Sequence, residues 1–221
     1  GTIDRVRTAF TLASTGSPPA RPDWIDFAHP NLVDADGLLA LERMPRSITI
    51  VGGGVIGSEY ACIFAELGIP TTLIEPRSGL MRFLDEEVRE RLESAMVETG
   101  IDLRLGRKPV AVAGADDHAI LELDGGDRLE SDIVLWSLGR QGNAANLGLE
   151  TVDVVPNDRG IISVDAEYRT NCPRVFAAGD VIGFPALAST SIEQGRVAAC
   201  RMFEIDDDRA FDDTAPTGIY T

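Results

Sequence analysis

The stretch ITIVGGGVIGSEYACIFAELGIPTTLIE, residues 48–75, contains the pattern that decides the fold. Its β-branched residues 48–51 predict a strand, and three glycines follow with the spacing G-x-G-x-x-G. The apolar segment 55–67 predicts a helix that stops at Gly68, and residues 71–75 predict a second strand. A tight glycine turn between a strand and a helix is typical of a doubly wound α/β fold with a parallel sheet.

Gly52, Gly54 and Gly57 stand where a dinucleotide-binding fold needs glycine. The first makes the tight turn, the second lets the backbone approach a pyrophosphate, and the third lets helix and strand pack closely. The free N–H groups at the start of the helix carry a partial positive charge and would bind the diphosphate. Because the preceding strand, the following helix and an acid at the next strand end are all present, the turn predicts a dinucleotide site.

Three charged residues near this turn bear on cofactor choice. Glu75 ends the second strand, where a carboxylate accepts hydrogen bonds from an adenosine ribose and repels a 2′-phosphate, which favours NAD over NADP. Arg77 is either a solvated loop charge or a guanidinium that could swing to a 2′-phosphate. Glu59, one turn into the helix, is either an ordinary polar residue or a group facing the nicotinamide pocket.

The following residues continue the alternation of strands and helices. Asp85 is expected to cap a helix in which Val88, Leu92 and Met96 recur every fourth residue, followed by a strand at residues 101–105. This completes a βαβαβ unit with right-handed crossovers. An antiparallel β-meander is expected at residues 110–112, 119–123 and 127–129, further strands at 9–12, 133–137, 161–164, 175–178 and 217–221, and helices at 34–41 and 191–203.

Composition narrows the possible partners. The net charge of −16 argues against nucleic acid and anionic membranes, because phosphate binding needs a basic face. No apolar run approaches the ~20 residues that span a bilayer, and no signal peptide opens the chain, so a cytoplasmic protein is expected. Cys62, Cys172 and Cys200 form no CxxC pair, so no disulfide framework and no metal site are expected.

Four stretches resemble, in order, the flavoprotein disulfide reductases. They are ASTGS at residues 13–17, GGGVIGSE at 52–59, LGR at 138–140 and TNCPRVFAAGD at 170–180. Among members of that family, the stretches GVIGSEYACIF, FLDEEV, LGRQGNAANLGLE, GDVIGFPALAS and PTGIYT are most similar to the soluble pyridine nucleotide transhydrogenases. The resemblance implies a Rossmann-like NAD(P)-binding domain, with its parallel sheet and meander, flanked by segments of an FAD domain.

The resemblance also implies domain ranges. Residues 1–46 would be an FAD-domain segment and crossover, 47–158 the NAD(P)-binding domain, 159–207 the FAD-domain return segment, and 208–221 a linker and the start of an interface domain. The first FAD fingerprint would lie upstream. The chain is therefore expected to be a piece of a longer protein.

Residue roles follow from the same resemblance. Thr15 and Gly16 correspond to a bend where the FAD domain contacts its nucleotide, and Gly139 of the LGR stretch is assigned to cofactor binding. Gly179 and Asp180 correspond to the site where a carboxylate receives the ribityl hydroxyls and the backbone meets the flavin diphosphate. A last pair, expected to lie against the flavin ring, is Leu187 and Ala188.

The implied activity is hydride transfer between NAD(P)H and flavin, as in a transhydrogenase that converts NADPH and NAD⁺ into NADP⁺ and NADH. No protein acid or base is required, so no catalytic residue is assigned. The full protein is expected to be a homodimer or larger homo-oligomer with nicotinamide dinucleotides as substrates. A dihydrolipoamide dehydrogenase or related disulfide reductase is the nearest alternative, and a nucleotide-binding module without turnover is an alternative of another class.

Overall fold

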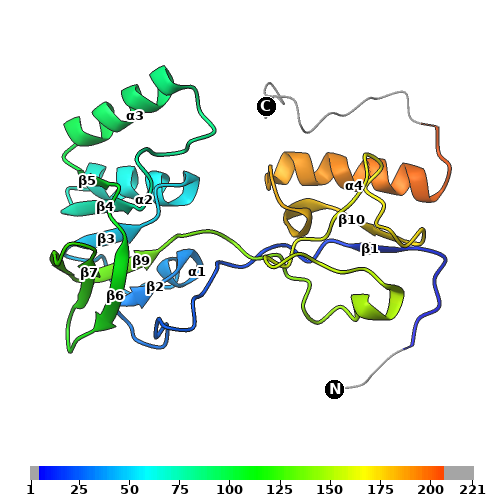
Figure 1. Cartoon of the computed structure of the whole chain (residues 1–221), viewed down its shortest axis with the longest axis horizontal. Coiled ribbons are helices and arrows are strands. Elements are labelled where there is room, and N and C mark those ends of the chain that lie inside the picture. Colours follow the sequence, from blue (N-terminus) through cyan, green and yellow to red (C-terminus); the bar gives the residue numbers. More distant parts are fainter. Residues whose placement is uncertain (1–4, 207–221) are drawn as a thin grey trace. The chain divides into compact units, whose positions relative to one another are not determined.

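The computed structural model describes residues 5–206, which divide into two compact units (Figure 1). One unit combines the chain up to Pro18 with the chain from Arg140 onward, and the other is Pro19–Gly139. The strand expected at residues 217–221 lies outside the described residues.

The unit Pro19–Gly139 is built on a five-stranded sheet in which every neighbouring pair is parallel. The strands, in spatial order, are β2 (Leu32–Val33), β9 (Ile133–Trp136), β3 (Ile48–Val51), β4 (Thr71–Glu75) and β5 (Asp102–Leu105). Its helices are α1 (Ala35–Leu38), α2 (Val55–Glu66) and α3 (Glu86–Glu98). The predicted βαβαβ unit and its parallel sheet are confirmed.

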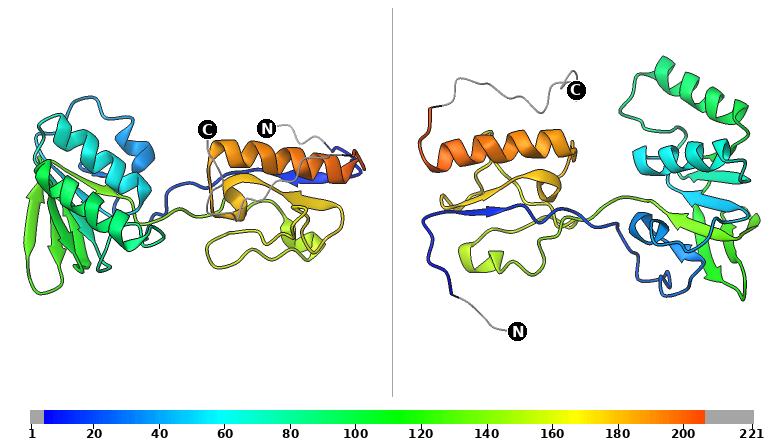
Figure 2. Two further views of the ribbon diagram at one scale, coloured as in Figure 1. Left: turned by 90° about the horizontal axis from the view of Figure 1, so that it is seen from above. Right: turned by 180° about the vertical axis from the view of Figure 1, so that it is seen from behind.

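Alternating side chains of this sheet enter two separate cores. Ile48 and Ile50 of β3 pack in a cluster with residues of α2 and α3, whereas Val51 packs in a second cluster with residues of strand β7 (Ala119–Leu123). The second cluster lies beneath an antiparallel meander of β6 (Pro109–Gly114), β7 (Ala119–Leu123) and β8 (Arg128–Ser131). The sheet therefore has helices on one face and the meander on the other (Figure 2).

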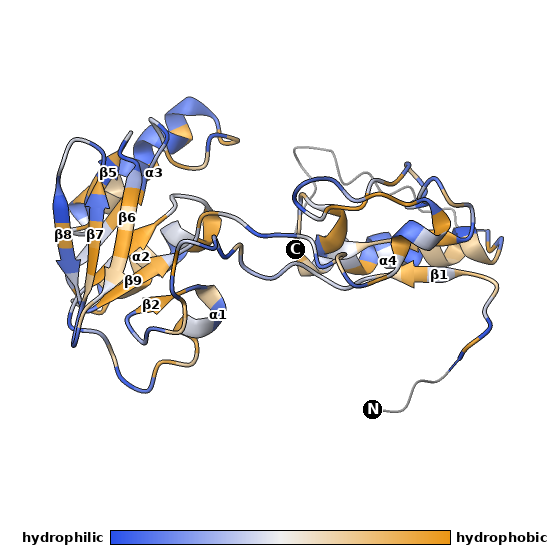
Figure 3. Ribbon diagram, turned by 60° about the horizontal axis from the view of Figure 1, so that its bottom comes forward, coloured by the Kyte–Doolittle hydropathy of each residue, from blue (hydrophilic) through white to orange (hydrophobic). Residues whose placement is uncertain are grey.

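The predicted apolar face of α3 is only partly confirmed. Met96 is fully buried and Leu92 packs against the first core cluster, but Val88 is 52% exposed because that cluster does not extend to the first turn of the helix. Asp85 occupies the N-cap position, but its side chain makes no capping hydrogen bond. Figure 3 shows that α3 is mostly hydrophilic, whereas strand β9 is apolar.

The second unit contains a two-stranded parallel sheet. β1 (Thr11–Ala13) pairs with β10 (Val175–Ala177), and α4 (Ala188–Met202) packs against β10. The 3₁₀ helices of this unit are η1 (Leu149–Val152) and η2 (Gly179–Ile182). The predicted helix at 191–203 starts three residues earlier, at Ala188.

The strand predicted at residues 161–164 is wrong. Ile162 is fully buried among apolar residues, as its hydrophobicity suggested, but its N–H donates to the carbonyl of Val181 in η2 rather than to a neighbouring strand. Burial between irregular segments selects the same apolar residues as burial in a sheet, so hydrophobicity alone does not distinguish the two.

The compact units divide the chain after residues 18 and 139, whereas the predicted domain ranges divide it after 46 and 158. Residues 19–46 supply β2 to the five-stranded sheet. Residues 140–158 contribute Ala144, Leu149 and Val154 to a core cluster that also contains Ala13 and Val175. The assignment of each range to a nucleotide remains a prediction.

A buried carboxylate ties the segment before β3 to the start of β9. Asp132, whose side chain is 1% exposed, accepts hydrogen bonds from Arg43 Nη1 at 2.7 Å, from the backbone N–H of Arg46 at 2.8 Å and from Arg46 Nη2 at 3.1 Å. The hydrogen bonds from Arg43 lead the contacts that hold the pKa of Asp132 well below its usual range. The two strands are thereby fixed side by side where both begin.

This carboxylate makes stability depend on pH. Its folded-state pKa lies below the unfolded value of about 4, so its contribution is complete above that pH and is lost as the pH falls through the folded pKa. We expect Asp132→Asn to lower the free energy of unfolding by about 2 kcal/mol at pH 7. In urea denaturation measured at a series of pH values, the midpoint of this variant should fall less at acid pH than that of the unsubstituted chain. Asp102→Asn, which removes an exposed ion pair with Arg104, should change stability by less than about 1 kcal/mol. Equal effects of the two variants would contradict the prediction.

Candidate nucleotide-binding site

The glycine turn after β3 uses its three glycines for different reasons. Gly52 has φ of +116°, and a Cβ there would lie 2.7 Å from the carbonyl oxygen of Ser137. A Cβ on Gly57 would overlap the carbonyl oxygen of Gly52. A Cβ on Gly54 would meet no atom within 4 Å. Gly52 and Gly57 are therefore required by packing within the protein, whereas Gly54 borders open space.

Gly54 is also the N-cap of α2, and no side chain caps this end of the helix. The N–H groups of the first turn of an α-helix have no partner within the helix and carry its positive dipole end. In α2 these N–H groups lie beside the open space at Gly54. No side chain blocks this space, so a ligand can approach the backbone there. The residues present fit the diphosphate of a dinucleotide, as the sequence predicts.

The end of β9 supports this turn from the neighbouring strand. The hydroxyl of Ser137 donates to the carbonyl oxygens of Val51 at 3.0 Å and Gly52 at 3.1 Å. Gly139 follows with φ of +98° and donates its N–H to the Ser137 carbonyl at 2.9 Å. Gly139 thus lies at the carboxyl edge of the sheet, one strand away from the turn. Ser137 was missed from the sequence, because its acceptors lie more than eighty residues away.

Glu75 reaches from the end of β4 to the glycine turn. Its side chain is 1% exposed, and Oε2 accepts a hydrogen bond from the N–H of Gly53 at 2.7 Å. Oε1 accepts from the backbone N–H of Arg77 at 2.9 Å and from its Nε at 2.8 Å. Arg77 is thus the ion-pair partner of Glu75. The side chain of Arg77 is 56% exposed, so it is half in solvent and half against the carboxylate.

The loop between β4 and α3 holds the other side of the turn. Leu80 is fully buried, and its N–H donates to Glu93 of α3 at 2.9 Å. The next N–H, of Met81, donates to the carbonyl of Gly53 at 3.2 Å. Glu59 lies on α2 with an exposed side chain, and both interpretations of it remain open.

The residues predicted for the second nucleotide lie in the other unit, at the carboxyl edge of its sheet. Thr15 and Gly16 follow β1, and Gly179 and Asp180 follow β10, whose last residue pairs in register with the last residue of β1. Gly16 has φ of +75° and Gly179 has φ of +78°, conformations that favour glycine. The two predicted pairs are therefore brought to one edge, where α/β sheets bind ligands.

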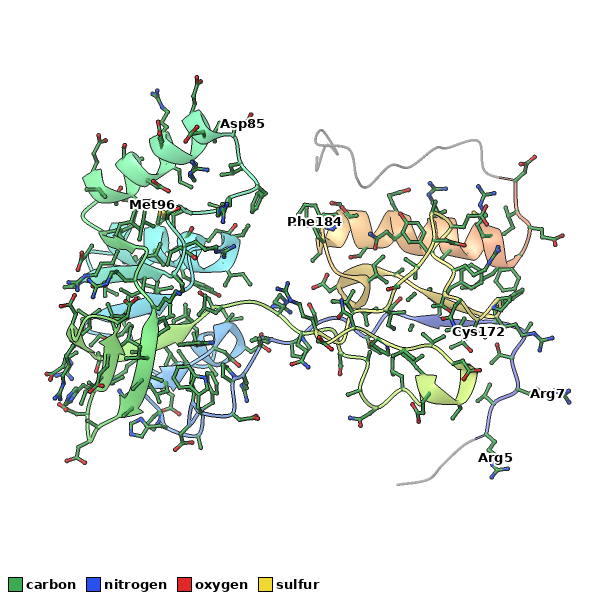
Figure 4. All side chains as sticks on the ribbon, viewed as in Figure 1. Arg5, Arg7, Asp85, Met96, Cys172 and Phe184 are labelled. Atoms are coloured by element: carbon green, nitrogen blue, oxygen red, sulfur yellow. The ribbon has the colours of Figure 1, made fainter. Side chains whose placement is uncertain are left out.

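The remaining predicted residues lie at the start of α4. Leu187 is the N-cap of α4 in an extended conformation and is 40% exposed, and Ala188, also exposed, begins the helix. Figure 4 labels the neighbouring Phe184 beside this end of the helix. The N–H of Gly179 donates to Gln194 of α4 at 2.8 Å, which attaches the helix to the loop after β10.

Comparisons with known proteins identify the class. Residues 11–195 match the model of the pyridine nucleotide-disulphide oxidoreductase family, and the chain belongs to that family. The predicted family, its α/β fold and its oxidoreductase class are confirmed, and the cofactors of the family are FAD and NAD(P).

Similar curated relatives share one name within this family. A soluble pyridine nucleotide transhydrogenase of Pseudomonas aeruginosa is 43% identical over 221 residues, which is 100% of this chain and 47% of the relative. The Marinobacter nauticus transhydrogenase is 42% identical over 219 residues, 99% of this chain and 47% of the relative. The chain thus spans about half the length of the curated relatives it matches.

Solved structures agree on the fold. LpdA of Mycobacterium tuberculosis superposes with a TM-score of 0.82 at 26% identity, covering 90% of this chain and 44% of LpdA. The flavoprotein disulfide reductase RclA of Escherichia coli gives 0.81 at 25% identity, covering 91% of this chain and 46% of RclA. Within residues 5–206, no helix is long and apolar enough to cross a membrane, and no cluster of three or more potential metal ligands occurs.

The two kinds of glycine should respond differently to substitution. We expect Gly57→Ala to lower the free energy of unfolding by at least about 2 kcal/mol, because backbone must move to admit the methyl group. Gly54→Ala should change it by less than about 1 kcal/mol, since the space is open and only the N-cap preference is affected. Urea denaturation followed by circular dichroism measures both. A Gly54→Ala variant as unstable as Gly57→Ala would contradict the geometry.

Proposed function

We propose that this chain forms the NAD(P)-binding unit and part of the FAD-binding unit of a soluble transhydrogenase, which converts NADPH and NAD⁺ into NADP⁺ and NADH. The observation that carries the proposal is the buried Glu75 carboxylate bonded to a glycine turn whose second glycine borders open space. The names of the relatives support the choice of reaction. A cytoplasmic homo-oligomer with nicotinamide dinucleotides as substrates is part of this proposal.

Each unit has its own task in the proposed reaction. In Pro19–Gly139, the N–H groups at the start of α2 bind the diphosphate beside Gly54, and Glu75 receives the adenosine ribose. In the other unit, Asp180 receives the ribityl hydroxyls of FAD, while Gly179, Thr15 and Gly16 bring backbone close to it. Bound FAD would supply the group that accepts and returns hydride.

The Glu75–Arg77 pair is what allows two cofactors at one site. A carboxylate alone repels the 2′-phosphate that distinguishes NADP from NAD. Arg77 binds Oε1 through its Nε, and 56% of its side chain is exposed, so its guanidinium has room to turn outward. Turning outward breaks this hydrogen bond and uncovers Oε1 of a carboxylate that is otherwise 1% exposed. We infer that Arg77 turns away from Glu75 when a nucleotide binds, which leaves Oε1 to the adenosine ribose, and that it pairs with the 2′-phosphate when this nucleotide is NADP.

The dinucleotide site is tested by filling the space at Gly54. Gly54→Val should abolish NADH binding in isothermal titration calorimetry, because its side chain occupies the volume the pyrophosphate needs. A matched control is Gly195→Val, which is equally unhindered but lies on α4 in the other unit. The control should bind NADH like the unsubstituted chain. Unchanged NADH affinity in Gly54→Val would show that the dinucleotide does not bind beside Gly54.

Cofactor choice is tested by titrating NADH and NADPH against two single variants. Glu75→Gln should raise NADPH affinity, since it removes the negative charge facing the phosphate. Arg77→Ala should lower NADPH affinity about tenfold or more, as expected for the loss of a charge-assisted hydrogen bond. Arg91→Ala removes one exposed cation from α3 and controls for net charge. Undiminished NADPH binding by Arg77→Ala would show that Arg77 has no part in NADP recognition.

A further inference from the structure

Three segments that are distant in sequence meet at one hydroxyl group in the unit that contains β1 and β10. Ser17, four residues beyond β1, is 7% exposed. Arg140 donates from Nε to Ser17 Oγ at 2.9 Å and from Nη2 to the Ser17 carbonyl oxygen. Ser17 Oγ in turn donates to Asp180 Oδ2 at 3.1 Å. Neither Ser17 nor Arg140 was assigned a role from the sequence.

The hydroxyl, rather than the guanidinium, makes the close contact with the carboxylate. The distance from Arg140 Nε to Asp180 Oδ2 is 3.9 Å, too long for a hydrogen bond. A serine hydroxyl has a single proton. Because Arg140 donates to this hydroxyl and has no acceptor to offer, the Ser17 proton is free to point at Asp180.

Arg140 also fixes where this hydroxyl sits. It binds both the hydroxyl and the carbonyl of Ser17, so the residue is held at its side chain and its backbone. The same stretch is held on either side, since the N–H of Gln141 donates to the Pro18 carbonyl at 3.0 Å and that of Asn143 to the Gly16 carbonyl at 3.0 Å. The donor that faces Asp180 is therefore in place before any ligand arrives.

We propose that Ser17 is a positioning residue for Asp180, aligned by Arg140, and that it prepares the carboxylate to bind a polyhydroxylated chain such as the ribityl group of a flavin. This inference rests on the proposed FAD-binding role of this unit. Asp180 is 27% exposed at the side chain, so without a partner it would have to be ordered on binding. With Oδ2 held by Ser17, the orientation of the carboxylate is set, and Oδ1 is the oxygen left for a ligand hydroxyl. Such preorganisation increases affinity by reducing the ordering cost of binding.

The test is a double-mutant cycle in the full-length protein, after removal of bound flavin and titration with FAD. Ser17→Ala should weaken FAD binding about three- to tenfold, as expected when the Asp180 side chain must be ordered on binding. Ser17→Thr keeps the hydroxyl and should restore most of the affinity. In the Asp180→Ala background, Ser17→Ala should have no further effect, because a residue that acts through Asp180 has nothing left to position. The visible circular dichroism of bound flavin should change in Ser17→Ala and return in Ser17→Thr.

Thr170→Val is the matched control for a merely structural hydroxyl. Thr170 is 6% exposed in the same unit, and its hydroxyl donates to the backbone carbonyl of Val175 at 2.8 Å. It should lower thermal stability without altering the flavin spectrum or the FAD dissociation constant at a temperature where the variant is folded.

The outcomes separate this inference from the proposed function. Unsubstituted protein that binds no FAD would overturn both. If the unsubstituted protein binds FAD, the inference alone is overturned when Ser17→Ala binds FAD normally, when Ser17→Thr is as weak as Ser17→Ala, or when the effects of Ser17→Ala and Asp180→Ala are additive. Loss in Ser17→Ala, rescue by Ser17→Thr and non-additivity together support it.

Discussion

The close approach of Gly57 to the carbonyl of Gly52 is the contact on which the nucleotide site depends. There is no room for a Cβ between the first helical turn and the strand end, so α2 starts directly against β3. The Ser137 hydroxyl bonds the same Gly52 carbonyl from β9. These contacts aim the N-terminus of α2 at the space beside Gly54. A bulkier residue at position 57 would move the helix and with it the N–H groups of its first turn.

The candidate site also offers a way for a protein with a net charge of −16 to bind a polyanion. The attraction comes from backbone N–H groups and the helix dipole, which act within the first turn and do not depend on net charge. Exposed acidic groups more than about 8–10 Å from a bound phosphate would be largely screened at physiological salt. Local geometry therefore outweighs overall charge at this position.

Sequence patterns predicted those features that arise from neighbouring residues. The glycine spacing, the strand–helix alternation and the acid at the end of β4 all lie within residues 48–75, and the structure confirms the elements they predicted. Ser137, Ser17 and Arg140 could not be found this way, because their partners lie from 85 to 163 residues away. The strand predicted at 161–164 failed for a related reason, since strand formation needs a partner edge that a local pattern does not contain.

The two candidate sites use one design with different bonds between carboxylate and arginine. Each carboxylate lies at or just beyond the carboxyl end of a parallel strand and has an arginine nearby. Glu75 ends β4 and bonds Arg77, whereas Asp180 follows β10 and bonds Ser17, which Arg140 holds. Arg77 lies two residues after Glu75 and bonds it directly, and its side chain is 56% exposed, so the guanidinium has room to turn toward solvent. Arg140 is bound to the hydroxyl and carbonyl of Ser17 and reaches Asp180 only through that hydroxyl. Moving Arg140 would therefore disrupt the hydrogen bonds that join three segments of the chain. An arginine that can leave suits a site that exchanges substrates, and an arginine that cannot leave suits a site that keeps its cofactor.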